Sequence, residues 1–134
     1  MQRRLFLAAM AAMPFVIQFA TTDAIAAERK TFDAASFKTA QQQGARILVD
    51  ISATWCPTCK AQKPIIDSLA EQPANSDLVI FAVDFDSQKP VVRQFGAQSQ
   101  STLIAFKGKT ETGRSVGDTD PGSIATLVQS NQTK

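Results

Sequence analysis

The chain has 134 residues, enough for one domain with a modest hydrophobic core but too few for two. Hydrophobic residues make up 44% and charged residues 19%, a composition typical of a globular protein, which excludes a disordered chain. The net charge of +2 gives no electrostatic basis for binding nucleic acid, and a chain with no His lacks the commonest general base and metal ligand.

The first 26 residues have the pattern of an export signal. Arg3 and Arg4 precede an apolar stretch over residues 5–20, and Ala24-Ile25-Ala26 has the small-x-small pattern of a cleavage site. The apolar stretch is too short for a stable membrane span. We therefore expect residues 1–26 to be a signal peptide and residues 27–134 to form one domain in the periplasm, where disulfides persist. The paired arginines also fit the twin-arginine route, so general secretion and twin-arginine export both remain open.

After this leader, the sequence predicts helices and strands in alternation. Asp33 is a suitable N-cap for a helix that ends at Gln43, before Gly44. The apolar run 47–51 predicts a buried strand, and a helix follows from the cysteine motif to about Glu71. Pro64 lies inside that helix and should kink it.

The second half of the chain continues the alternation. It predicts a buried strand over 78–83, a short helix over 90–95, strands over 102–106 and about 111–116, and a last helix that Asp120 and Pro121 begin. The order α-β-α-β-α-β-β-α indicates a mixed sheet with helices on both faces, a three-layer α/β domain.

Both cysteines lie in the stretch "TWCPTCK", residues 54–60. Cys56 precedes the helix, where free backbone amides and the helix dipole favour a thiolate, and Pro57 suits the first helical position. We expect Cys56 to be the nucleophile and Cys59, more enclosed in the first turn, to resolve the mixed disulfide and form the Cys56–Cys59 bridge.

Three other uses of the two cysteines compete with this redox use. A purely structural disulfide would close a tiny loop and stabilise little, and a zinc site needs about four ligands, which only a dimer could supply. Inert buried thiols are the third, but the export signal and the helix-start position count against them. The redox use is favoured.

Asp50 interrupts the apolar strand six positions before Cys56. If Asp50 is buried, its pKa should be raised, and the carboxylate could accept the proton of Cys59 when that sulfur attacks. Alternatively, Asp50 lies at a strand end in solvent or bonds a loop amide. Spacing alone does not separate these two interpretations.

The stretches "ILVDISATWCPTCKAQKPII" and "VDFDSQKPVVRQFGAQSQSTLIAFKGK" resemble the thioredoxin family, and the likeness covers residues 30–130. The resemblance implies the thioredoxin fold and favours Asp50 as the proton acceptor, because it stands at the family's buried acid. It also implies a substrate-binding surface, whose expected residues are Trp55, Pro57, Thr58, Gln100, Ser101 and Thr102. Trp55 is expected to cover the rim of the site, although it could equally be a packing residue.

The sequence departs from the family at two positions. Ser101 stands where the family has a cis-proline, and we expect a trans peptide there because a non-proline cis bond costs about 2.5–4 kcal/mol. In the family, loss of this proline is associated with altered substrate release and with metal or iron–sulfur capture. Ala82 stands where thioredoxins often carry a lysine near the buried acid, so Asp50 should lose one stabiliser of its ionised form.

The sequence therefore predicts an exported thiol–disulfide oxidoreductase that reduces disulfides of envelope proteins. The pair Pro57-Thr58 resembles the motif interior of exported thioredoxin-like reductants. We expect no cofactor, no metal, no nucleic acid, a monomer, and a membrane electron carrier that re-reduces the protein. The alternatives are a disulfide oxidant, a metal or iron–sulfur protein, and a peptide-binding module without turnover.

Overall fold

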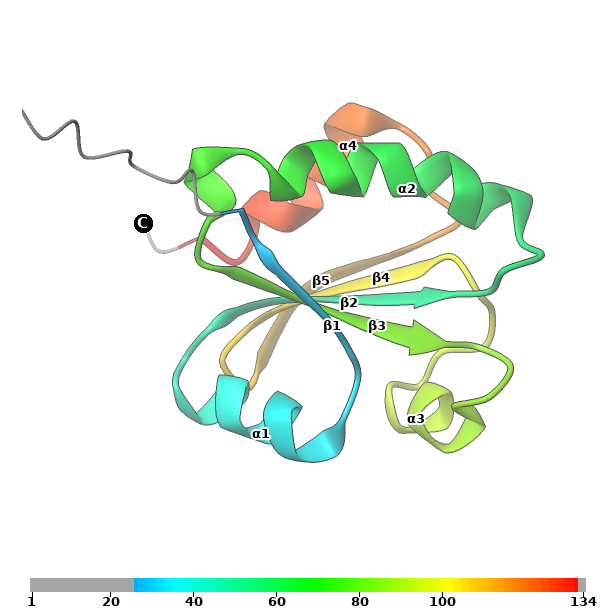
Figure 1. Ribbon diagram of the computed structural model, residues 1–134, viewed down its shortest axis with the longest axis horizontal. Coiled ribbons are helices and arrows are strands. Elements are labelled where there is room, and N and C mark those ends of the chain that lie inside the picture. Colours follow the sequence, from blue (N-terminus) through cyan, green and yellow to red (C-terminus); the bar gives the residue numbers. More distant parts are fainter. Residues whose placement is uncertain (1–25, 133–134) are drawn as a thin grey trace, which may run out of the picture.

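The computed structural model describes residues 26–132, so the predicted signal peptide lies outside the described residues except for Ala26. Within them, strands and helices alternate along the chain (Figure 1). In chain order the elements are β1 Glu28–Thr31, α1 Ala34–Gln42, β2 Arg46–Ser52, α2 Pro57–Ala70, the 3-10 turn η1 Pro73–Asn75, β3 Leu78–Asp84, α3 Lys89–Gln94, β4 Thr102–Lys107, β5 Thr110–Val116 and α4 Pro121–Gln129.

The five strands form one mixed sheet in the order β1-β3-β2-β4-β5. The central strand β2 pairs in parallel with β3 and antiparallel with β4. Because β2 has neighbours on both sides and helices on both faces, residues 46–51 are all buried, as the continuous apolar run predicted. The mixed three-layer arrangement confirms the predicted fold class.

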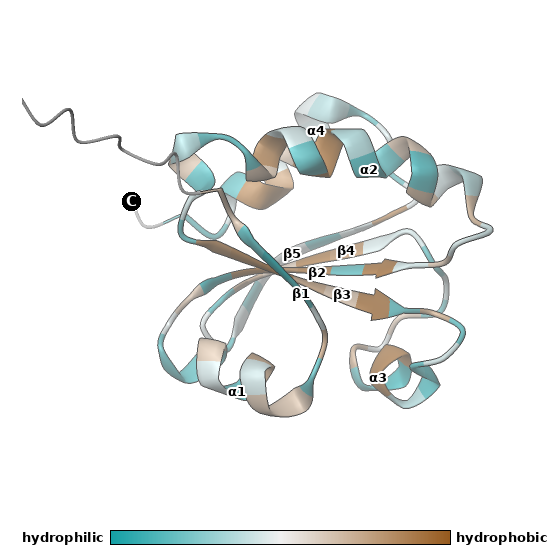
Figure 2. Cartoon of the chain, in the orientation of Figure 1, coloured by the Kyte–Doolittle hydropathy of each residue, from teal (hydrophilic) through white to brown (hydrophobic). Residues whose placement is uncertain are grey.

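Each face of the sheet has its own core (Figures 1 and 2). Helices α1 and α3 cover one face, where aromatic rings pack edge to face around Phe37. Helices α2 and α4 cover the other face, where aliphatic side chains of the helices and the strands pack together, among them Leu48, Ile66, Leu103 and Ile124. The aliphatic core fixes α2 against the sheet, and therefore places the cysteine pair at its start beside the end of β2.

The predicted helices and strands are confirmed, but the predicted order lacked the first strand. β1 pairs in parallel with β3 at the edge of the sheet, from Glu28 opposite Val79 to Thr31 opposite Ala82. Its sequence, "ERKT", has three charged residues in four and no apolar alternation, because an edge strand on solvent needs little apolar surface. The usual strand signal is absent from it.

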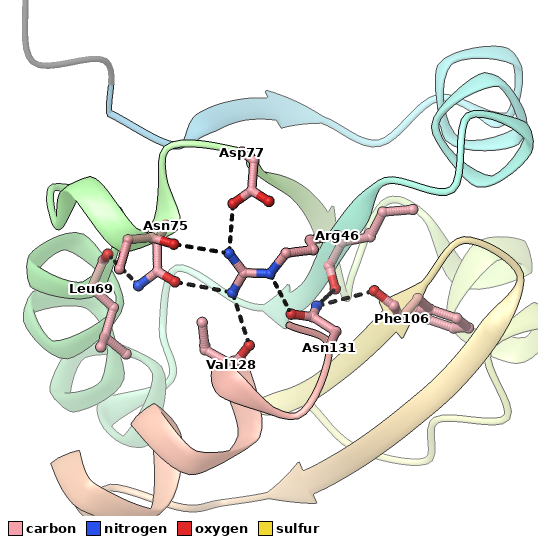
Figure 3. A network of polar contacts seen from close by, with 9 residues as sticks. Arg46, Leu69, Asn75, Asp77, Phe106, Val128 and Asn131 are labelled. Atoms are coloured by element: carbon pink, nitrogen blue, oxygen red, sulfur yellow. Dashed lines mark hydrogen bonds and ion pairs between the residues drawn. The ribbon is translucent and has the colours of Figure 1, made fainter. Parts of the chain in front are cut away.

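A buried arginine joins the start of β2 to α4 and to the loop after α2 (Figure 3). The Arg46 guanidinium donates to the side chains of Asn131, Asn75 and Asp77, at 3.0, 3.0 and 2.6 Å. It also donates to the backbone carbonyls of Ala74 and Val128, both at 3.2 Å. This Arg46 network holds the last described residues onto the sheet.

The two ends of the described chain lie at the same end of the molecule, opposite the loop between β2 and α2 (Figure 1). The Ala27 amide donates to the Ala70 carbonyl at the end of α2, at 2.8 Å, and Asn131 bonds Arg46 at the start of β2. Over residues 26–132, no helix has the length and apolar character needed to cross a membrane.

Candidate active site

The cysteine pair lies where β2 ends and α2 begins: Cys56 is the last residue of the four-residue connection, and Cys59 lies in the first turn of α2. Cys56 is the N-cap of α2, and its sulfur accepts the Cys59 amide at 3.1 Å. Pro57 takes the first helical position, which needs no amide hydrogen bond. The two cysteines form the predicted disulfide, with their Cα atoms 5.3 Å apart. When the disulfide is reduced, the same amide and the positive end of the α2 dipole stabilise a Cys56 thiolate.

The expected difference in enclosure between the two cysteines is wrong. In the disulfide form Cys56 is 1% exposed and Cys59 is 9% exposed, so Cys56 is the more enclosed. The pair packs with Ala53 and Phe85 in a small cluster of its own, which covers the N-cap position as well as the first turn. Cys59 was expected to be the more enclosed cysteine because, within the helix alone, the first turn lies deeper than the N-cap.

Asp50 lies in the interior of β2, paired with Ala82 of β3 and Leu103 of β4. The solvent-exposed strand-end interpretation is therefore wrong, because its carboxyl is almost fully buried. Burial raises the pKa of Asp50, as predicted; the positive charge of Arg29 opposes this rise, and the negative charge of Asp67 adds to it. Asp50 and Cys59 line the same open cavity of about 240 Å³.

The loop before β4 has an unusual backbone at Ser101. The Gln100–Ser101 peptide is trans, as predicted, and Ser101 is the one described non-glycine residue with a positive φ, +57°. Its carbonyl accepts the Gly117 amide at 2.9 Å and the Gln62 side-chain amide of α2 at 3.4 Å. Gln62 is fully buried and also donates to the Asp118 carbonyl at 2.8 Å, so α2 is tied directly to this loop.

Trp55 lies at the surface beside the disulfide and is 54% exposed. Its indole N–H donates to the Asp86 carboxylate, at 2.7 Å, in the loop after β3. This fits a residue at the rim of the site better than one that packs in the core. Pro57 is exposed, Thr58 and Gln100 are partly exposed, and Thr102 is buried, with its hydroxyl donating to the Ser99 carbonyl at 2.8 Å.

Comparison with known proteins identifies the architecture. The family model described as Thioredoxin matches residues 28–130. The chain belongs to the thioredoxin family. The cysteine pair at the start of α2 is the redox pair of a thioredoxin-type thiol–disulfide oxidoreductase, and thioredoxins act on protein disulfides.

Individual thioredoxins are similar over most of the domain. The thioredoxin of Chlamydia muridarum is 37% identical over 86 residues, which is 64% of this chain and 82% of that protein. Thioredoxin-2 of Saccharomyces cerevisiae is 38% identical over 85 residues, covering 63% of this chain and 79% of that protein. The crystal structure of Trxlp from Edwardsiella tarda EIB202 is 40% identical with a TM-score of 0.73, covering 75% of this chain and 98% of that one.

Three polar residues around this thioredoxin site were not predicted from the sequence. Arg29 lies on β1 and pairs with Asp50. Because the strand β1 was not predicted, no sequence pattern placed a cation beside Asp50. Asp86 follows β3 and accepts the hydrogen bond of the Trp55 indole N–H. The acidic stretch "VDFD" was the only sequence feature that pointed to this residue. Gln62 lies on the buried face of α2, and a polar residue at a core position of the predicted helix could have pointed to it.

The described residues offer no ready metal site. Nowhere in residues 26–132 do three or more Cys, Asp or Glu side chains gather in an arrangement that could hold a metal ion. The cysteine pair therefore brings two sulfur ligands, and a structural zinc ion needs about four.

Proposed function

We propose that this thioredoxin-family chain is an exported reductant of protein disulfides in the bacterial cell envelope. In this proposal Cys56 attacks the substrate, Cys59 resolves the intermediate, and Asp50 accepts the Cys59 proton. The observation that carries the proposal is the Cys56 sulfur at the N-cap of α2, accepting the Cys59 amide at 3.1 Å, because this position stabilises an attacking thiolate.

The reaction has two exchange steps. The Cys56 thiolate attacks one sulfur of a substrate disulfide; a Cys56–substrate bond forms, the substrate S–S bond breaks, and the released thiolate takes up a proton. Cys59 then gives its proton to the Asp50 carboxylate and attacks the Cys56 sulfur, which forms the Cys56–Cys59 disulfide and releases the second substrate thiolate, again protonated. Two electrons pass from the protein to the substrate, and a dithiol carrier at the membrane returns them.

The leader and the motif support export and the direction of electron flow. The family match begins at residue 28, just after the expected cleavage site at Ala26, which supports a leader that lies outside the family domain. Disulfides persist in the bacterial periplasm, so an exported protein with a redox Cys pair meets disulfide substrates there. Neither a His in the motif nor an inserted helical domain, both usual in oxidases of the superfamily, is present in the described residues.

Insulin reduction tests the enzymatic part. The purified protein, in the processed form that the cell produces, should accelerate insulin reduction when dithiothreitol is supplied, and Cys56→Ser should abolish the acceleration. Ser115→Ala, which removes a hydroxyl on the edge strand β5 far along the chain from the motif, is a matched control that should retain it. A wild-type protein that gives no acceleration would refute the reductase.

Trapping and localisation test the remaining parts. Cys59→Ser should accumulate mixed disulfides with envelope proteins, and a trap that captures none would favour a peptide-binding module. Cell fractionation should place the protein in the periplasm with an N-terminus at Ala27, and Lys replacement of Arg3 and Arg4 separates the twin-arginine route from general secretion. A strongly oxidising measured reduction potential would instead support the oxidant, and a coloured or metal-loaded preparation the iron–sulfur or metal protein.

A further inference from the structure

The counter-charge of Asp50 comes from the first strand of the fold. We propose that Arg29 of β1 is a positioning residue for the resolving step, because its guanidinium holds the Asp50 carboxylate in the ionised form that receives the Cys59 proton. This inference rests on the proton-acceptor role proposed above for Asp50. It assigns a function to the edge strand β1.

The geometry places Arg29 between two carboxylates. One terminal nitrogen lies 3.5 Å from the Asp50 carboxylate, and the other donates to Asp67 of α2 at 3.0 Å. The Arg29 side chain is about one-third exposed, at 35%, while that of Asp50 is almost enclosed. Both line the 240 Å³ cavity that Cys59 also lines, so the ion pair lies beside the path of the proton.

The charge environment of Asp50 comes from β1 and α2. The strands paired directly with β2 present the neutral partners Ala82 on β3 and Leu103 on β4 and so bring no charge. The remaining charges are Arg29 on β1, together with Lys60, Lys63 and Asp67 on α2; Lys63 forms an ion pair with Asp67. Arg29 is the cation within ion-pair distance of Asp50, and Asp67 competes for it.

This arrangement predicts opposite effects for two neighbouring substitutions. Burial raises the pKa of Asp50, and Arg29 opposes that rise, so Arg29→Gln should raise it further. Asp67 adds to the rise in the pKa of Asp50 and also binds Arg29. Asp67→Asn should therefore lower the pKa of Asp50, because the Arg29 guanidinium then pairs with Asp50 alone. A general loss of packing would not produce two shifts of opposite sign.

Stopped-flow mixing of the reduced protein with the chromogenic disulfide dithiobis(nitrobenzoate) separates the two exchange steps. Cys56 attack releases one coloured thiolate, and Cys59 resolution releases the second, so the second phase reports the proton transfer to Asp50. Its rate is measured against pH for the wild type and for Arg29→Gln, Arg29→Lys, Asp67→Asn and Asp50→Asn. Lys30→Gln is the matched control, because Lys30 is also a β1 cation but pairs with Glu28.

In Arg29→Gln the midpoint of the second phase should move to higher pH. The rate below that midpoint should fall about three- to tenfold, less than for a fully buried ion pair because the Arg29 side chain is about one-third exposed. Above the midpoint the rate should equal or exceed that of the wild type, because a more basic carboxylate is the better acceptor. Asp67→Asn should move the midpoint to lower pH, Arg29→Lys should restore most of the wild-type profile, and Lys30→Gln should leave it unchanged.

Three results would overturn the inference in different ways. If Asp50→Asn changes the second phase but Arg29→Gln behaves like Lys30→Gln, Asp50 is the acceptor and Arg29 is not its counter-charge. If Asp50→Asn leaves the second phase unchanged, the proton-acceptor role fails and the inference fails with it. In the Asp50→Asn background, Arg29→Gln should have no further effect, and an equal effect there would show that Arg29 acts elsewhere. A ¹³C titration of the Asp50 carboxyl in Asp67→Asn, a change at a partly exposed ion pair, gives a second reading should Arg29→Gln fold poorly.

Discussion

Replacing Arg46 by Met should destabilise the domain far more than replacing its exposed ionic partner. Arg46→Met keeps a long, flexible side chain but removes the guanidinium and with it the five hydrogen bonds of the Arg46 network. The acceptors of Asn75 and Asn131 then lack donors in a buried setting, since both side chains also use their amides to hold neighbouring backbone carbonyls.

The magnitude follows from those two acceptors. Each buried acceptor without a donor costs about 1–3 kcal/mol, and the gain from no longer burying a guanidinium offsets part of the sum. We expect a net loss of about 2–4 kcal/mol in the free energy of unfolding, a large share of the ~5–15 kcal/mol typical of a domain. Asp77→Asn should cost only about 0–1 kcal/mol, because the Asp77 side chain is 65% exposed.

Urea unfolding followed by far-UV circular dichroism measures both variants. Arg46→Met should lower the urea midpoint by roughly 1–2 M with little change in slope, and Asp77→Asn should leave it almost unchanged. Arg46→Lys, which keeps the charge but not the planar fork, should fall between them. An Arg46→Met variant as stable as the wild type, or an Asp77→Asn variant as unstable as Arg46→Met, would refute the reasoning.

Three further predictions, each on a single feature, are tested by the same unfolding assay. The pKa of Asp50 is raised in the folded state above its ordinary value of 3.8, so between those two pKa values the folded state binds more protons than the unfolded state, and stability falls as pH rises. Asp50→Asn should therefore stabilise the domain at about pH 8 but not at about pH 4. An equal gain at both pH values would contradict this. Ser101→Gly should be more stable than Ser101→Ala by roughly 0.5–1 kcal/mol, because both variants lose the hydroxyl but only Ala keeps a Cβ at φ +57°. A Ser101→Ala variant more stable than Ser101→Gly would disprove backbone strain at this position. Asp120→Ala removes the N-cap that accepts the Ser123 amide at 2.7 Å and should cost about 1 kcal/mol, whereas its neighbour Thr119→Ala should cost nothing measurable.

The sequence was sufficient for the fold because its elements carry local signals. Asp33 and Asp120 cap the first and last helices as predicted, and the apolar runs around residues 48 and 80 became the central strands. β1 was missed because a four-residue edge strand is held by backbone pairing to β3, some fifty residues further along the chain, and that pairing leaves no periodic trace in "ERKT".

The chemistry-bearing residues of the site were predictable, but their polar neighbours were not. Cys56, Cys59 and Asp50 stand in one short segment whose spacing carries information. Arg29 and Gln62 meet the site only through the tertiary fold. Arg29 lies on a strand separated from β2 by the helix α1, and Gln62 bonds a loop 39 residues away. Side-chain hydrogen bonds between distant segments have no counterpart in sequence periodicity.

The placement of both chain ends opposite the disulfide determines how the domain can be attached to anything else. A segment joined at Ala26, or one that continues past Gln132, departs from the end where α2 finishes and β2 begins. A fused carrier domain, an affinity tag or a leader kept as a membrane tether would thus leave the end of the molecule that carries the redox pair free for a partner approaching from the other side. The same domain could be immobilised on a surface by either end without covering Cys56 and Cys59.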